Sequence, residues 1–182
     1  MNVGAGSGER GAGRAAALFF IGALLPALSA AELRSLVIPG TAIVIAAPVA
    51  WQTVEPADGT IIRLAKPGGG AGFAVSIAPL SPGQGPAGFT QASLTELQRM
   101  TYGFDLVDWD FNLKLGKRTW SRLHFRCVIG ETRWEQQVWL TADNGQAVTV
   151  ACSALPAEWA AWAPVFERCL AESAGSRPVL GP

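Results

Sequence analysis

Apolar and polar side chains alternate through most of residues 115–153, the longest such pattern in the chain. Successive side chains of a β-strand point to opposite faces, so this alternation predicts strands. Gly130 interrupts the pattern once, and Asp143-Asn144-Gly145 interrupts it again. Glycine and asparagine tolerate the positive φ that tight hairpins require. We therefore expect a meander of three consecutive antiparallel strands.

The two faces of this meander differ in chemistry. One face is apolar, while the other combines tryptophans with basic, acidic and amide side chains. If the strands pair in sequence order, this second face, the aromatic–basic face, consists of Trp120, Arg122, His124, Arg126, Arg133, Glu135, Gln137 and Trp139. Tryptophan and arginine are enriched in protein interfaces, so this face is the candidate binding surface. Alternatively, a helix or the N-terminal hairpin covers its tryptophans, which leaves the Gly/Pro loops at 67–72 and 80–88 as candidates.

Shorter patterns on the N-terminal side of the meander predict further strands and a helix. β-branched or alternating runs predict strands over residues 41–47, 59–66, 72–78 and 105–115. The last run places its apolar residues on one face, namely Val107, Trp109, Phe111, Leu113 and Leu115. Helical spacing over residues 89–100, with Thr90 as the candidate N-cap, predicts a helix between the strands.

A second helix is predicted after the meander. Pro156 opens it, since proline is tolerated in a first helical turn. Its apolar stripe, Trp159, Trp162, Phe166, Cys169 and Leu170, is expected to face the core. Pro164 lies inside this pattern and should kink or split the helix.

Residues 1–31 have the pattern of an export signal. Arg10 and Arg14 precede an apolar run from Ala15 to Leu28, which is shorter than the roughly 20 residues needed to span a bilayer. A cleaved signal is favoured over an uncleaved anchor because the run is short and contains Pro26. We therefore expect a periplasmic or secreted protein with no stable membrane span after signal removal.

The remainder has the size and charge of one ordinary globular domain. Residues 32–175 are expected to form that domain, followed by a loose tail over residues 176–182. The chain carries 14 Lys and Arg against 14 Asp and Glu. A nucleic-acid-binding protein would normally show a basic excess, so this class is disfavoured.

The order of the elements resembles the PsbP-like superfamily. The residues that carry the resemblance are Ile43-x-Ile45-x-x-Pro48-x-x-Trp51, Gln137-Val138-Trp139-Leu140, and Gly145 followed by Val148-Thr149-Val150. The superfamily includes the extrinsic subunit of the plant oxygen-evolving complex, the periplasmic DcrB proteins and a yeast Ran-binding factor. The resemblance covers most of residues 41–172 and implies an α+β fold, with an antiparallel sheet packed with helices as an α-β-α sandwich. Its members mostly bind partners or assist assembly, which does not fix a function here.

The three cysteines of the sequence leave two alternatives open. Cys127 and Cys152 are expected on the same face of the meander but two strands apart, at about 10 Å, which exceeds the roughly 7 Å that a disulfide allows. Cys169 could pair with either of them, and Cys152 is preferred. Otherwise all three are reduced, buried thiols. Their spacing lacks the paired pattern of a zinc site, so we expect no metal and no cofactor.

No catalytic motif is evident in the sequence. His124 is its single histidine and is flanked by Arg122 and Arg126. There is no G-x-S-x-G motif, and Asp108 and Asp110 share a face without a third ligand. We expect an exported, non-enzymatic binding or assembly module with a protein partner in the cell envelope. The alternatives are a small hydrolase that uses His124 with a carboxylate from another strand, and an immunity or inhibitor protein for a secreted toxin.

Overall fold

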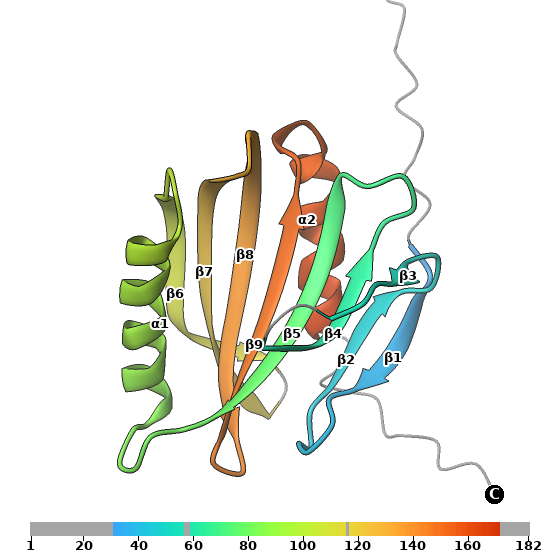
Figure 1. Cartoon of the computed structure of the whole chain (residues 1–182). Coiled ribbons are helices and arrows are strands. Elements are labelled where there is room, and N and C mark those ends of the chain that lie inside the picture. Colours follow the sequence, from blue (N-terminus) through green and yellow to red (C-terminus); the bar gives the residue numbers. More distant parts are fainter. Residues whose placement is uncertain (1–30, 57–58, 116, 172–182) are drawn as a thin grey trace, which may run out of the picture.

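A seven-stranded antiparallel sheet is the framework of the protein (Figure 1). The computed structural model describes residues 31–56, 59–115 and 117–171. The strands are β3 (Gln52–Thr53), β4 (Thr60–Ala65), β5 (Ala71–Pro79), β6 (Asp105–Leu115), β7 (Arg118–Ile129), β8 (Thr132–Asp143) and β9 (Gln146–Ala154). Their order is β3-β4-β5-β9-β8-β7-β6. The predicted meander is confirmed as β7, β8 and β9, and the signal and tail predictions lie outside the described residues.

A separate hairpin precedes the large sheet. It consists of β1 (Leu33–Val37) and β2 (Val44–Pro48), which pair with each other in an antiparallel ladder. β2 contains most of the predicted strand over residues 41–47. β1 was not predicted, because Leu33–Val37 shows no sustained alternation.

Two helices pack on opposite faces of the large sheet. Helix α1 (Pro86–Met100) contributes Leu94 to a cluster with Leu123 and Phe125 of β7, and Val138 of β8 belongs to the same cluster. Helix α2 (Pro156–Ala171) contributes its buried residues to a larger cluster that includes β2, β5, β9 and the two buried tryptophans of the meander. The chain therefore has the predicted α-β-α layers, with α2 behind the sheet as drawn in Figure 1 and α1 at its β6–β8 end.

The boundaries of both helices differ from those predicted. α1 begins at Pro86 with Gly85 as its N-cap, so Thr90 lies inside the helix. The Thr90 hydroxyl is buried there, and it hydrogen-bonds to the Pro86 carbonyl and to Ser121 on the sheet. α2 continues through Pro164 without a break, so the prediction of a split helix is wrong. Pro164 is exposed, and the buried residues on its C-terminal side hold the second half of the helix against the sheet.

Strand β6 also departs from its prediction. Val107, Trp109 and Phe111 were predicted to share one apolar face with Leu113 and Leu115, yet all three are exposed, Trp109 by 54%. β6 is an edge strand that pairs only with β7, and that pairing shifts register twice. The shifts break the simple alternation of faces, and the edge position leaves one side of the strand without a neighbour.

The turn between β8 and β9 fastens the N-terminal hairpin to the large sheet. Asp143 Oδ2 accepts a hydrogen bond from the Ala42 amide at 2.6 Å, and Oδ1 accepts one from Arg118 at 2.7 Å. The Ala42 amide, followed by Arg118, lowers the pKa of Asp143 below its usual value. The carboxylate therefore contributes stability that is present above the ordinary carboxyl pKa and is lost as pH falls through the lowered value.

We expect Asp143→Asn to lower the free energy of unfolding near neutral pH by roughly 1 kcal/mol, because the charge-assisted contacts are weakened. The difference from the native chain should shrink as pH falls below the ordinary carboxyl range. Urea unfolding at a series of pH values measures both effects. Glu131→Gln, in the exposed turn after β7, is the control; a loss for Asp143→Asn that is independent of pH would contradict the assignment.

Candidate functional site

Helix α2 covers the aromatic–basic face. Trp120 and Trp139 are each only 2% exposed and belong to the cluster that contains Phe166 of α2. The prediction of an open surface is therefore wrong for both tryptophans. The physical reason is that the apolar stripe of α2 needs an apolar surface to pack against, and these two side chains supply part of it.

The charged residues of this face lie around the tryptophans. Arg122 forms ion pairs with Asp108 of β6 and Glu167 of α2, and its guanidinium carbon lies 5.9 Å from the Trp139 ring centroid. Arg126 lies nearer the surface, 3.6 Å from Asp105. Arg133 is exposed at the start of β8. A partner contact through Arg126 and Arg133 stays a prediction.

His124 and Glu135 form a covered pair between the sheet and α2. Their side chains approach to 2.8 Å, between His124 Nε2 and Glu135 Oε1. The His124 ring stacks on Trp159 of α2 with 4.9 Å between centroids and 15° between planes. Glu135 is 6% exposed and also lies 3.7 Å from Arg126. The pair connects β7, β8 and α2, which is a structural role that the sequence pattern did not reveal.

Removing one member of this pair should leave the other buried without its partner. We expect His124→Ala and Glu135→Ala each to lower the free energy of unfolding by about 1–3 kcal/mol. The double variant should lose less than the sum of the single losses, because the two side chains interact. Urea unfolding of the four proteins checks this, with Arg133→Ala as the exposed control on the same face. Strictly additive losses would show that the pair does not interact.

All three cysteines are buried, and none of them forms a disulfide in the structure. Cys127 lies opposite Trp134 in the ladder and Cys152 lies opposite Gln137, so the two cysteines point to opposite faces of the sheet. The expectation of a shared face is therefore wrong, although direct pairing of these two stays excluded. Cys152 and Cys169 share the α2 cluster, and burial, followed by the nearby Cys169, raises the pKa of Cys152 well above its usual value.

A buried thiol with a raised pKa forms little of the reactive thiolate. We therefore expect the reduced, folded protein to react slowly with a thiol reagent at Cys152, and all three thiols to react after unfolding in denaturant. Mass spectrometry of the modified peptides identifies each site. Fast modification of Cys152 in the folded chain would contradict the burial described here.

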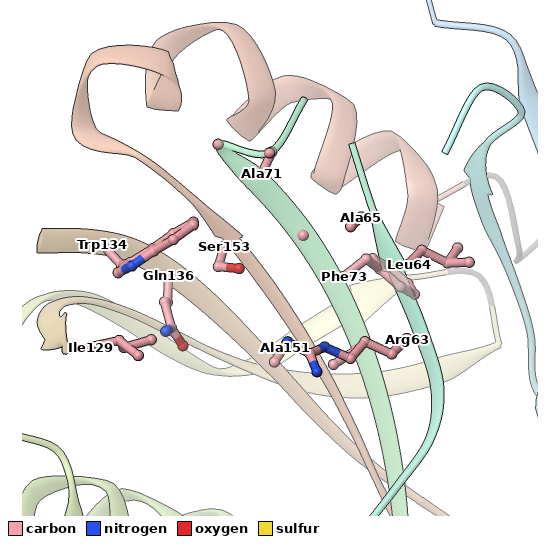
Figure 2. Close-up of a pocket in the computed structure, with 14 residues that line it drawn as sticks. Arg63, Leu64, Ala65, Ala71, Phe73, Ile129, Trp134, Gln136, Ala151 and Ser153 are labelled. Atoms are coloured by element: carbon pink, nitrogen blue, oxygen red, sulfur yellow. The ribbon is translucent and has the colours of Figure 1, made fainter. Parts of the chain in front are cut away.

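The opposite face of the sheet is open beyond α1. Two adjoining hollows lie on it, one of about 570 Å³ beside α1 and one of about 390 Å³ over β9, β5 and β4. Gln136 and Ala151 line both, so the two hollows form one trough. Figure 2 shows the second hollow, with Trp134 and Gln136 on one side and Arg63 on the other.

Small side chains make the floor of this trough. The register places Ala65 beside Gly72, Gly72 beside Ser153, and Ala74 beside Ala151. The residues between them on β5 and β9, such as Phe73 and Cys152, point to the α2 face and are buried. A Cβ at Gly72 would already approach Ser153 Oγ to 3.4 Å, so even one added methyl group reaches the facing side chain.

The trough was not predicted from the sequence. Small residues alternate with larger ones along β5 and β9. The sequence signal that could have identified the site is that several strands each carry small residues, and that these residues lie next to one another once the strands pair. That arrangement depends on the pairing of β5 with β9, which are far apart in the chain. One of the alternative loops, 67–72, does border the trough at Gly69 and Gly70.

Several solved structures are similar to this one. Cyanobacterial PsbP (CyanoP) from Synechocystis gives a TM-score of 0.58 at 12% identity, covering 81% of this chain and 94% of that one. LpqN of Mycobacterium tuberculosis, which is involved in cell envelope biogenesis, gives 0.56 at 14%, covering 76% and 87%. A putative regulator of unknown function from Pseudomonas aeruginosa gives 0.52 at 13%, covering 81% and 99%.

The chain has the PsbP-like fold. The resemblance drawn from the sequence is thereby confirmed at the level of fold. No protein-family model and no curated protein matches the chain. Neither helix in the described part of this PsbP-like chain is long and apolar enough to cross a membrane.

Proposed function

We propose that this protein is an exported, non-enzymatic binding or assembly module, and that it binds through the trough beside α1. The observation that carries the proposal is the uncovered half of the sheet. The face that holds the buried tryptophans packs against α2 through those tryptophans, whereas the opposite face combines an apolar wall, a floor of small residues and one cation. Hollows of this size and lining are typical of binding sites.

Two observations support a location outside the cytoplasm. Residues 1–31 have the pattern of an export signal. The structurally similar LpqN is involved in cell envelope biogenesis. The proposed partner is therefore a component of the cell envelope.

A photo-crosslinking amino acid placed at Ala74, in the floor of the trough, tests the proposal in cells of the source organism. Adducts should form at position 74 and be absent when the crosslinker replaces Thr95, on the exposed side of α1. Filling the trough with Ala151→Phe should remove the adducts at position 74. Identical adducts at both positions would show that the trough is not a binding face.

One observation supports the alternative that the protein is a small hydrolase, namely the contact between His124 and Glu135. Trp159 stacks on His124 and Glu135 is buried, so a substrate could reach the pair only after α2 moved. An ester and amide substrate panel tests it: hydrolysis that is lost in His124→Asn, with the fold intact, would favour this alternative over the proposal.

A further inference from the structure

We infer that the trough binds a single-chain amphiphile that ends in a carboxylate, with its alkyl chain along α1 and its head group at Arg63. The inference rests on the proposed function, because it names the ligand of the same site. It follows from the different chemistry of the two ends of the trough.

The end beside α1 is apolar. Its wall is formed by Phe89, Leu97 and Met100 of α1, and its floor by Val138 and Leu140 of β8. Glu96 also lines this end, and it pairs with Arg99 within the helix. The apolar wall and floor therefore offer an alkyl chain apolar contacts.

The other end offers a cation and polar side chains. Arg63 is exposed and has no carboxylate partner among the residues that the structure describes. Lys66, the next cation along the chain, does not line the hollow and is held by Glu158 of α2 at 2.6 Å. Figure 2 shows the Arg63 side chain reaching over the floor toward Ala151, with the Ser153 hydroxyl and the Gln136 amide around the same hollow.

These groups suit a carboxylate. A guanidinium binds a carboxylate through two parallel hydrogen bonds, and such charge-assisted bonds are stronger than neutral ones. The Ser153 hydroxyl can donate another hydrogen bond from the floor. A cationic head group would instead face the unpaired guanidinium and be repelled.

The sheet itself argues for an alkyl chain over an extended peptide. β5, β9 and β8 lie inside the sheet, and each is hydrogen-bonded to a strand on both sides. Their backbone groups are therefore engaged and cannot form a ladder with an added strand. A peptide laid on this floor would leave its own amides without backbone partners, whereas an alkyl chain has none to satisfy.

Titration calorimetry of the full chain with dodecanoate, below the concentration at which it forms micelles, tests the inference. Dodecanoate should bind, hexanoate should bind much more weakly because it leaves the apolar end empty, and dodecyltrimethylammonium should not bind. Dodecanol, which has the same chain without the charge, should bind about tenfold or more weakly, as expected when a charge-assisted hydrogen bond is lost.

Two variants locate the ligand. Arg63→Gln should weaken dodecanoate about tenfold and leave dodecanol unchanged, while Arg34→Gln on β1 should alter neither. Ala151→Phe should abolish binding of both, and Ala74→Phe serves the same purpose should Ala151→Phe fail to fold. Equal affinities for dodecanoate and dodecanol, or dodecanoate binding that survives both floor variants, would overturn the inference.

The two proposals fail in different ways. If dodecanoate does not bind but the crosslinker at Ala74 still gives trough-specific adducts, the carboxylate amphiphile is wrong and the binding module stands. Adducts on a protein under those conditions would point to a partner helix as the occupant. If neither experiment gives a trough-specific result, both proposals are wrong.

Discussion

The packing of helix α2 on the large sheet determines most of the remaining structure. Trp51 and Trp162 meet edge to face with 5.0 Å between their centroids, and Phe166 packs beside them. The sheet contributes Trp120 and Trp139 to the same apolar layer. Aromatic side chains bury large areas, so this layer supplies much of the free energy that holds the helix, the sheet and the N-terminal hairpin together.

This layer also explains why polar groups are found in the interior. Alternation in β7 and β8 places His124 and Glu135 on the same face as the two tryptophans. When α2 covers that face, these polar side chains are covered as well and must find partners, which they do in each other. The charged residues farther out, Arg122 among them, remain partly exposed and pair across β6, β7 and α2.

The sequence predicted the fold better than it predicted the site. The meander, the other long strands and the two helices follow from local periodicity, which needs no knowledge of tertiary structure. The exposure of Trp109 and the burial of Trp120 could not be predicted, because each depends on which element lies over the strand. The trough depends on the pairing of β5 with β9, a long-range contact that leaves no local pattern. The contact of His124 with Glu135 became visible only with the strand register.

The β5–β9 pairing has a consequence for the folding of the chain. β5 belongs to the N-terminal half of the domain and β9 is the last strand of the meander, so their ladder closes a long loop of chain. Closing long loops costs entropy and slows folding, which makes this ladder a late step compared with the hairpins on either side. The floor of the trough lies across the β5–β9 ladder, so it forms only after these two strands have paired. A ligand held there would bind only the completed fold and would stabilise it by mass action, so occupancy of the trough would report that the chain has finished folding.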